Sequence, residues 1–425
     1  MNNAASNLTP ARIPTDWNGR EMQQRVRRRY AAERRFRRIG LFAVSLSAAF
    51  LAFLLISMLG NGLRGFTQTE VRLPVDFARS TLILDPALLS GPGAEAALAT
   101  ADFQGVTASA AEAAYGADGV QIVSEGAWLR VREAVRDDPA LLQGRGDIWV
   151  PASTEIDLAV KGDSEPAFEA LRQRLDRSGS LRTGFNSTFL TGADATDPAQ
   201  VGIWGAFKGS LITMLVTLAI AFPIGVLSAV YLEEYAPRNR WTSLIEVSIN
   251  NLAAVPSIIF GLLGLAVFLN TFNMPRSAPL VGGLTLALMT MPVIVIAGRN
   301  AIKSVPPSIR DAALGIGASR IQVVFHHVLP LALPGILTGT IIGMARALGE
   351  TAPLLMIGMR AFIASPPGGL TEPATVLPVQ IFLWSDEVSR GFVEKTSAAI
   401  IVLLVFLLAM NGLAIYLRNK FERRW

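Results

Sequence analysis

Two ionisable residues interrupt an apolar stretch that is long enough to cross a membrane. Arg346 and Glu350 are the only charged residues between Leu331 and Met359. They are four residues apart, a spacing that places both side chains on one face of a helix. An ionised side chain within a bilayer is costly unless it is paired or hydrated. The pair is therefore the first candidate for chemistry in this chain.

Two interpretations of this pair stay open. In the first, Arg346 and Glu350 form a structural ion pair with each other or with a neighbouring helix. In the second, they belong to an anion pathway, because arginine can form two parallel hydrogen bonds to a phosphate group. Glu350 would then balance the charge of Arg346 when the site is empty.

The second candidate is the stretch Asp311–Pro330, DAALGIGASRIQVVFHHVLP, which lies between two apolar runs. Pro306 and Pro307 suit the first turn of a helix, where a missing N–H does no harm. Gly317 could end that helix. Small or apolar residues follow at helical spacing on one side, which would let this side seat closely against another protein: Ile309, Ala312, Ala313 and Ile316.

Enzyme chemistry is not expected. The chain has no cysteine, and its two histidines, His326 and His327, are adjacent, which provides neither a thiol nor a metal site. No G-x-x-x-x-G-K-[ST] loop is present, so we expect no ATP hydrolysis by this chain. The apolar stretches hold no Ser/Lys, Asp/Asp or His cluster at catalytic spacing. We therefore predict no catalytic residue, no cofactor and no metal.

The composition predicts a membrane protein. Of 425 residues, 51% are hydrophobic and 17% are charged, whereas soluble domains carry about 25% charged residues. Six apolar stretches each reach the roughly 20 residues that a spanning helix needs. We predict six transmembrane helices over 39–63, 209–232, 247–275, 277–298, 331–359 and 396–417.

The distribution of charge predicts the orientation of these helices. Residues 1–38 contain 10 arginines and 3 acidic residues, and such basic flanks favour the cytoplasmic side. Residues 61–200 contain 12 basic and 20 acidic residues, a net charge of −8, and are expected outside. The net charge of +5 therefore gives no reason to expect a nucleic-acid partner. Further basic clusters fall on the predicted inner side: Arg238, Arg240, Arg299, Lys303, Arg310, Arg320, Arg418, Lys420, Arg423 and Arg424.

The outer segment is long enough to bury its own core. Glu70–Phe77 alternates apolar and polar residues, which predicts a strand, and Pro74 argues for an edge strand. Helical spacing follows over 128–142 and 165–175, and 147–160 reads as one or two strands. We predict a small α+β domain that is either a spacer or a docking surface for an extracytoplasmic partner.

The stretch around Asp311 resembles a known family. Asp311-Ala-Ala-x-x-x-Gly317, followed by His327-Val-Leu-Pro330, is similar to the EAA loop of bacterial ABC importer permeases. Asp311 stands where that motif has Glu, and His327 where it usually has Ile. The resemblance implies a helix that couples the permease to a cytoplasmic ATPase, with contacts carried by Asp311, Ala312, Ala313, Gly317, Leu329 and Pro330.

The resemblance extends to a subfamily. Ala345–Leu355, ARALGETAPLL, and Val255–Gly261, VPSIIFG, are similar to spans of the phosphate importer permeases called PstA. This implies an all-α polytopic membrane protein with a type I ABC importer permease core and an inserted α+β extracytoplasmic domain. We expect a basic cytoplasmic segment over 1–38, a first transmembrane helix over 39–60, the extracytoplasmic domain over 61–202, a core of five transmembrane helices over 203–417 and a cytoplasmic tail over 418–425.

The implied function is that of a permease subunit of an ATP-driven inorganic phosphate importer in the bacterial inner membrane, with both termini cytoplasmic. The implied partners are a second, PstC-like permease, PstB-like ATPase subunits, a PstS-like phosphate-binding protein and the lipid bilayer. One alternative changes the cargo to molybdate, sulfate or phosphonate. Another is a membrane sensor with a ligand-binding outer domain, although its internal loops are short for a sensor.

Overall fold

The computed structural model describes residues 19–82, 84, 89, 91, 93–163, 165–360 and 362–421. The chain divides into two compact units, residues 1–57 and residues 58–425. The beginning of the predicted basic segment and residues 422–425 of the predicted tail lie outside the described residues.

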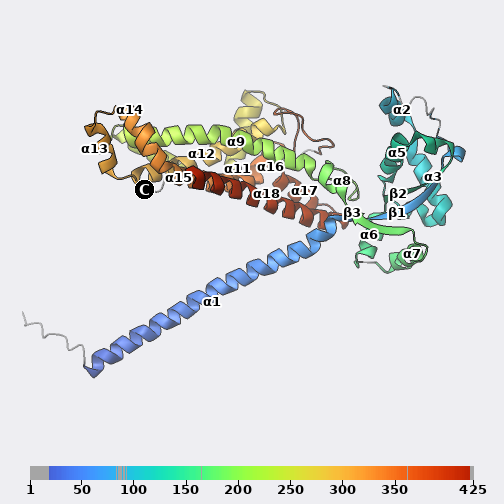
Figure 1. The fold of residues 1–425 in the computed structure, drawn as a ribbon, viewed down its shortest axis with the longest axis horizontal. Helices are drawn as coiled ribbons and strands as arrows, with labels where there is room; N and C mark the ends of the chain where they lie inside the picture. The colour runs from blue at the N-terminus through green and yellow to red at the C-terminus, as the bar shows by residue number, and fades with distance from the viewer. Residues whose placement is uncertain are drawn as a thin grey trace, which may run out of the picture. The chain divides into compact units, whose positions relative to one another are not determined.

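Helix α1 (Arg20–Gly65) crosses from the first unit into the second. Figure 1 colours α1 in shades of blue. Within the first unit, every residue from 32 to 57 is exposed, and this segment holds most of the first predicted span. A helix that is apolar on all sides is typical of a membrane span.

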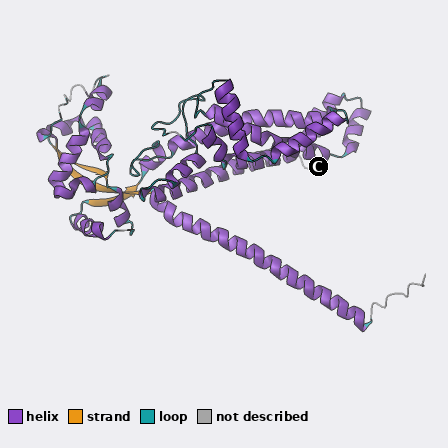
Figure 2. Cartoon of the chain, turned by 180° about the vertical axis from the view of Figure 1, so that it is seen from behind, coloured by secondary structure: helices purple, strands orange, loops and turns teal. Residues whose placement is uncertain are grey.

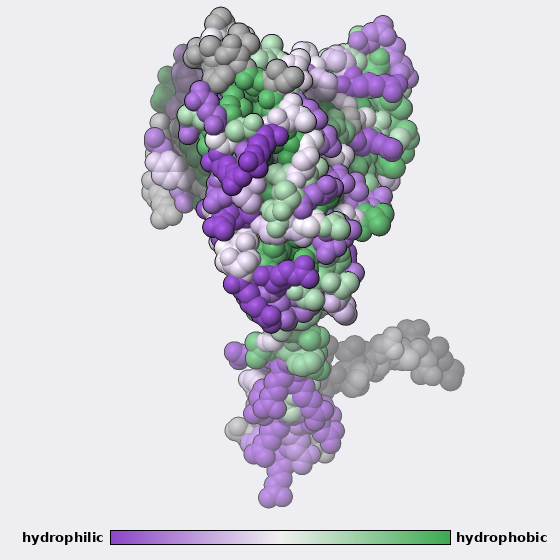
Figure 3. Space-filling view, turned by 90° about the vertical axis from the view of Figure 1, so that its right-hand side faces the viewer, coloured by the Kyte–Doolittle hydropathy of each residue, from purple (hydrophilic) through white to green (hydrophobic). Residues whose placement is uncertain are grey.

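The predicted α+β domain has a three-stranded antiparallel sheet in the order β2-β1-β3, drawn in orange in Figure 2. The strands are β1 (Thr67–Asp76), β2 (Arg145–Pro151) and β3 (Leu181–Phe185). Val71, Leu73 and Val75 of β1 are buried, as the alternation of apolar residues predicts. Figure 3 shows many hydrophilic residues on the outer surface of this domain.

The predicted edge position of Pro74 is wrong, because β1 is the central strand. The pairing explains how proline is accommodated there. β3 pairs with β1 only from Thr67 to Val71, so Pro74 lies beyond the end of β3. The N–H of Arg72 points to that side and donates to the carbonyl of Ser180. Position 74 faces the same side, two residues further along β1, where no strand lies opposite. A proline, which has no N–H to donate, therefore loses no ladder hydrogen bond there.

The helices of this domain cover the sheet and correct a second expectation. Residues 147–160 are not all strand: β2 ends at Pro151, and α6 (Thr154–Val160) follows. Glu155 and Asp157 in the first turn of α6 favour a helix start there. The remaining helical elements are η1 (Phe77–Arg79), α2 (Ala94–Thr100), α3 (Phe103–Tyr115), η3 (Gly116–Asp118), α4 (Gly119–Ile122), α5 (Ala127–Asp137), η4 (Pro139–Gln143), α7 (Pro166–Arg177) and α8 (Ser187–Thr191).

A helical bundle follows the α+β domain. Its elements are α9 (Trp204–Val230), η5 (Tyr231–Tyr235), α10 (Arg240–Ala253), α11 (Ser257–Gly264), η6 (Leu265–Thr271), α12 (Pro279–Lys303), α13 (Pro307–Gly315), α14 (Arg320–Gln322), η7 (Val323–Val328), α15 (Leu329–Leu348), α16 (Ala352–Met356), α17 (Leu377–Ser385) and α18 (Gly391–Phe421). Among the described residues, 5 helices are long and apolar enough to cross a membrane, or up to 6 if one bent pair counts as a span.

The bent pair replaces the third predicted span. Arg240–Ala253 and Ser257–Thr271 are two helical segments that meet at an angle of 101°. Pro256 lies in the break, where its ring opposes a helical conformation of the residue before it. The apolar run over 247–275 therefore does not form one straight helix.

The fifth predicted span is also shorter than expected. α15 ends at Leu348, and the short helix α16 begins at Ala352. Gly349 has low helix propensity, and Pro353 disfavours a helical residue directly before it. The predicted helix over 331–359 is therefore broken between residues 349 and 351.

Small residues bring the bundle helices close together. A Cβ at Gly283 of α12 would lie 2.5 Å from the side chain of Val216 on α9, and a Cβ at Gly339 of α15 would lie 2.1 Å from that of Ala297 on α12. Both separations are too short for a real side chain. The glycines thus permit backbone approaches of the kind that membrane helices use for packing.

Candidate functional site: a surface helix and a charged pair at a helix break

A helix, α13, lies where the coupling helix was predicted, and its ends are well defined. Pro306 precedes it and Pro307 occupies its first turn. At the other end, Gly317 has a φ of +89°. Its N–H donates to the carbonyl of Leu314, and the N–H of Ala318 donates to the carbonyl of Ala313. These two bonds complete a Schellman cap. The prediction that Gly317 ends this helix is confirmed.

The face that α13 presents differs from the predicted one. Ala313 is buried, and Ile309 packs against the same apolar cluster. Asp311 and Ala312 point outward, as does Ile316, which is 83% exposed. Sequence spacing alone did not separate the inward from the outward residues. We define the exposed face of α13 as Asp311, Ala312, Leu314, Gly315 and Ile316.

Arg310 fastens α13 to the bundle. Its guanidinium Nη2 lies 2.7 Å from Glu234 Oε1 in η5 and 3.0 Å from the carbonyl of Ile302, and its Nη1 lies 2.7 Å from the carbonyl of Val305. The side chains of Arg310 and Glu234 are 22% and 12% exposed. This arrangement uses the fork geometry of arginine, which lysine does not have.

A second ion-pair group lies beside this anchor. Arg299 of α12 contacts Glu246 of α10 at 2.7 Å and Glu233 of η5 at 3.4 Å, and Lys303 contacts Glu233 at 3.5 Å. Sequence reasoning used Arg299, Lys303 and Arg310 only as markers of orientation. The acidic partners of these basic residues are Glu233 and Glu234. Two adjacent acids at the end of a long uncharged run were the feature of the sequence that could have identified them.

Leu329 and Pro330 lie within one helical path from Arg320 to Leu348. A π-helical segment, η7, precedes them. Pro330 lacks an N–H and its ring crowds the preceding turn, which explains a local change of pitch there. Leu329 packs on the apolar cluster that buries Ala313. His327 is half-buried and lines a cavity of about 640 Å³ together with His326 and Pro330.

Arg346 and Glu350 form an ion pair with each other, with Arg346 Nε 3.3 Å from Glu350 Oε1. They are not in the middle of a helix, however. Arg346 lies in the last turn of α15, and Glu350 lies in the break beyond it. The side chain of Arg346 is 46% exposed and that of Glu350 is 17% exposed. Nearly half of the Arg346 side chain is therefore exposed, whereas the Glu350 side chain is largely covered.

The two helix breaks of the bundle lie next to each other. α11 packs against α16: Gly261 approaches Pro353, and Gly264 approaches Ile357. The residue numbers of both contacts rise together, so the two segments run parallel. The first turn of α11, at Ser257, therefore lies beside the break that holds Glu350. In membrane transporters, substrate sites are typically formed where helices are discontinuous.

Asp194 lies outside the membrane-length helices, in the connection from the α+β domain to α9. Its Oδ1 accepts a hydrogen bond from the indole Nε1 of Trp384 in α17 at 3.0 Å. Burial raises the pKa of Asp194 above its ordinary value, and this hydrogen bond opposes the shift. This hydrogen bond attaches the connection to α17, while the chain itself continues into α9.

Two family models match the chain. One, described as "Binding-protein-dependent transport system inner membrane component", matches residues 221–424. This range contains α13 and the Arg346–Glu350 pair. The other, described as "Domain of unknown function (DUF3333)", matches residues 23–170, which cover most of α1 and much of the α+β domain.

Several curated proteins are similar to the chain. "Probable ABC transporter permease protein YqgI" of Bacillus subtilis (strain 168) is 31% identical over 252 residues, which cover 55% of this chain and 84% of that protein. "Phosphate transport system permease protein PstA" of Yersinia pestis is 31% identical over 214 residues, covering 50% and 71%. "PstA 1" of Mycobacterium tuberculosis (strain CDC 1551 / Oshkosh) is 35% identical over 156 residues, covering 37% of this chain and 51% of that protein, or about half its length.

Proposed function

Because this chain belongs to the family of binding-protein-dependent transport system inner membrane components, we propose that it forms the translocation pathway of an ATP-driven importer of inorganic phosphate. Membership of this family makes the chain a multi-pass membrane permease subunit of an ABC importer and not an enzyme. The sensor alternative is set aside for the same reason. The cargo, the partners and the roles of individual residues are our proposal.

The observation that carries the cargo proposal is the half-exposed side chain of Arg346 paired with the largely covered side chain of Glu350. Arginine offers two parallel N–H donors to an oxyanion. Glu350 holds the guanidinium when no anion is present and leaves part of it accessible. The names of the PstA relatives, at 31% and 35% identity, favour phosphate among the oxyanions.

The exposed face of α13 supports a coupling role. We propose that an ATPase subunit binds this face, and that its closure moves α13 as a body because Arg310 and Ala313 fix the inner side of the helix. Ala313 packs in the apolar cluster that includes Val324 and Val328, so this motion would pass directly into α15. From Leu329 to Arg346, α15 covers about 26 Å.

The proposed assembly contains a second permease resembling PstC, ATPase subunits resembling PstB and an extracytoplasmic phosphate-binding protein resembling PstS. It lies in the bacterial inner membrane. The basic ends of the chain, over 1–38 and 418–425, face the cytoplasm, and residues 61–202 face outward. In support, α13 and the α+β domain lie at opposite ends of α9 in Figure 1.

Another oxyanion is the second candidate, because a guanidinium binds sulfate, molybdate or phosphonate by the same geometry, and the YqgI relative is named only as a probable ABC permease. The test is to purify the tagged chain with its partners, reconstitute the complex and measure ATP-dependent uptake of labelled phosphate. Excess unlabelled phosphate should abolish uptake, and excess sulfate or molybdate should not. Competition by sulfate or molybdate alone would transfer the proposal to that anion.

A further inference from the structure

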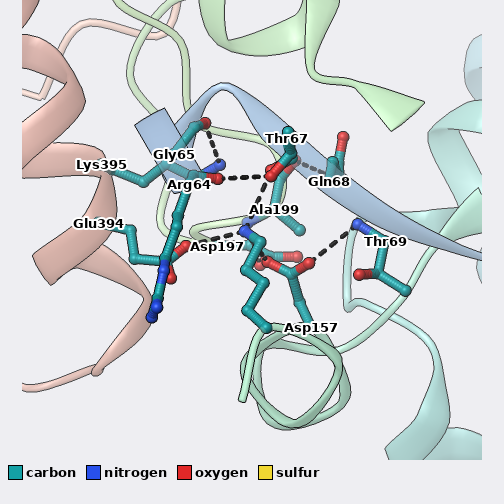
Figure 4. A network of polar contacts seen from close by, with 11 residues as sticks. Arg64, Gly65, Thr67, Gln68, Thr69, Asp157, Asp197, Ala199, Glu394 and Lys395 are labelled. Atoms are coloured by element: carbon teal, nitrogen blue, oxygen red, sulfur yellow. Dashed lines mark hydrogen bonds and ion pairs between the residues drawn. The ribbon is translucent and has the colours of Figure 1, made fainter. Parts of the chain in front are cut away.

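One lysine joins the α+β domain to the helical bundle. The Nζ of Lys161, at the end of α6, lies 2.7 Å from Asp157 Oδ2, 2.8 Å from Glu394 Oε2 and 3.1 Å from the carbonyl oxygen of Thr67. These acceptors belong to α6, α18 and β1. An ammonium group has three donors, so each donor of Lys161 reaches a different element. Figure 4 shows Asp157, Glu394 and Thr67 grouped around the point where these bonds meet.

The group is shielded from water. The side chains of Lys161 and Glu394 are 6% and 11% exposed, and that of Asp157 is 17% exposed. The other oxygen of Asp157 accepts the backbone N–H of Thr69 at 2.9 Å. A shielded ion pair with satisfied donors is far more sensitive to loss of one partner than an exposed pair is.

Neighbouring contacts reinforce the same junction. Lys395, the residue after Glu394, is 4% exposed, donates to the carbonyl of Gly65 at 3.3 Å and lies 5.6 Å from the ring centroid of Phe189. Phe189 in turn contacts Trp384 of α17 at a centroid distance of 6.3 Å. The first turns of α18 are thus held by the end of α1, by α6 and by α8.

We propose that the α+β domain and the N-terminal turns of α18 form one rigid unit of the permease, and that Lys161 is the positioning residue that holds them together. α18 packs along α15, the helix that carries Arg346. A partner that binds the α+β domain would therefore act on the pathway helices directly and not through a flexible tether. This inference rests on the proposed function only for its transport readout.

The first test measures rigidity independently of cargo. Because the chain has no cysteine, spin labels can be placed at Gln173→Cys on α7 and at the exposed Val393→Cys in the first turn of α18, in the assembled complex. We expect one narrow distance distribution that is the same in the nucleotide-free and ATP-trapped states. A shift of that distance between the two states would overturn the proposal. In a Lys161→Met background, the distribution should broaden, and an unchanged distribution would equally count against it.

The second test replaces the lysine link with a covalent one. A Cβ at Gly391 would lie 2.8 Å from Cγ2 of Thr154 and also 2.8 Å from Cβ of Pro198. Thr154→Cys with Gly391→Cys, made together with Pro198→Gly to remove that clash, therefore brings two thiols close enough to form a disulfide. We expect oxidation of this pair to leave uptake and ATPase activity within twofold of the reduced protein. Loss of both on oxidation, with recovery on reduction, would mean that the domain must separate from α18, which contradicts the proposal.

Rescue distinguishes a positioning role from a general effect on folding. Lys161→Met should lower uptake at least tenfold, and the oxidised 154–391 disulfide should restore it until reductant is added. Failure of the disulfide to rescue would refute the positioning role. Arg390→Met is the matched control. Arg390, the residue before α18, also contacts the domain at Glu165, at 3.3 Å. Both side chains are 60% exposed, so uptake should not change. If Lys161→Met does not assemble, the spin-label distance and the disulfide, both measured in the otherwise native chain, still test whether the domain and α18 form one rigid unit. If the native complex carries no phosphate, the proposed cargo fails, whereas the distance measurement stands.

Discussion

The guanidinium of Arg310 and the carboxylate of Glu234 lie 2.7 Å apart although 76 residues separate them in the chain. This contact joins α13 to η5, the helical turn that follows α9. Arg310 also donates to the carbonyl of Ile302 at the end of α12 and to the carbonyl of Val305 just after it. The helix that we propose as the ATPase contact is therefore fixed to the bundle by a side chain, while its opposite face stays exposed.

Replacing Arg310 should weaken this attachment. Arg310→Ala leaves a largely buried carboxylate without its partner, which typically costs about 3 kcal/mol. We expect a lower Tm and fewer phosphate ions transported per ATP hydrolysed, measured in the reconstituted complex. Arg320→Ala removes an exposed arginine of α14 and serves as the control. Unchanged coupling in Arg310→Ala would argue against this attachment as part of the coupling route.

The exposed face of α13 should be needed for assembly and not for folding. Ile316→Asp changes a side chain that is 83% exposed, so the free energy of unfolding should change by less than about 0.5 kcal/mol. Co-purification of the ATPase and uptake should both be lost. Ala313→Asp is the contrasting variant: it buries a charge and should destabilise the bundle itself. An Ile316→Asp complex that keeps its ATPase would contradict the proposed contact.

Two neighbouring glycines provide a matched test of the helix end. Gly317 has a φ of +89°, whereas Gly315 lies within α13 with nothing near the position of a Cβ. Gly317→Ala should destabilise the protein by about 1 kcal/mol because the side chain strains that conformation. Gly315→Ala should be neutral or stabilising by up to about 1 kcal/mol. Equal Tm values for the two variants would show that the Schellman cap is not important for stability.

Burial of Asp194 predicts a pH dependence of stability. Its pKa is raised on folding, so the folded state binds the proton more tightly than the unfolded state. The resulting stabilisation is complete below the unfolded pKa near 3.8 and is lost as the pH rises through the higher folded pKa. The Asp194→Asn protein lacks this contribution. We therefore expect its Tm, relative to that of the native chain, to increase from pH 4 to pH 7. A constant difference would rule this explanation out.

Local patterns in the sequence predicted the elements but not their breaks. Proline and glycine defined the ends of α13, and uncharged runs located the membrane-length helices. The same runs hid the 101° bend near Pro256 and the end of α15 at Leu348, because hydropathy averages over a window and does not register a single break. The strand expected over the second half of 147–160 failed because apolar alternation does not distinguish a short amphipathic helix from a strand.

Long-range pairing was the other part that the sequence could not provide. The contacts of Lys161 with Glu394 and of Arg310 with Glu234 depend on which helix ends meet in space, and spacing along the chain contains no such information. Arg346 and Glu350 were predictable as a pair because they are local. That Glu350 lies in a break beside the first turn of α11 followed only from the packing of Gly261 and Gly264.

The most direct measurement is uptake of labelled phosphate by a reconstituted complex that carries Arg346→Gln. Arg276→Gln, an exposed arginine in the connection before α12, is the control. We expect Arg346→Gln to assemble with its partners, keep its ATPase subunits and lose at least tenfold of the uptake, while Arg276→Gln transports normally. Full phosphate uptake by an assembled Arg346→Gln complex would contradict this expectation.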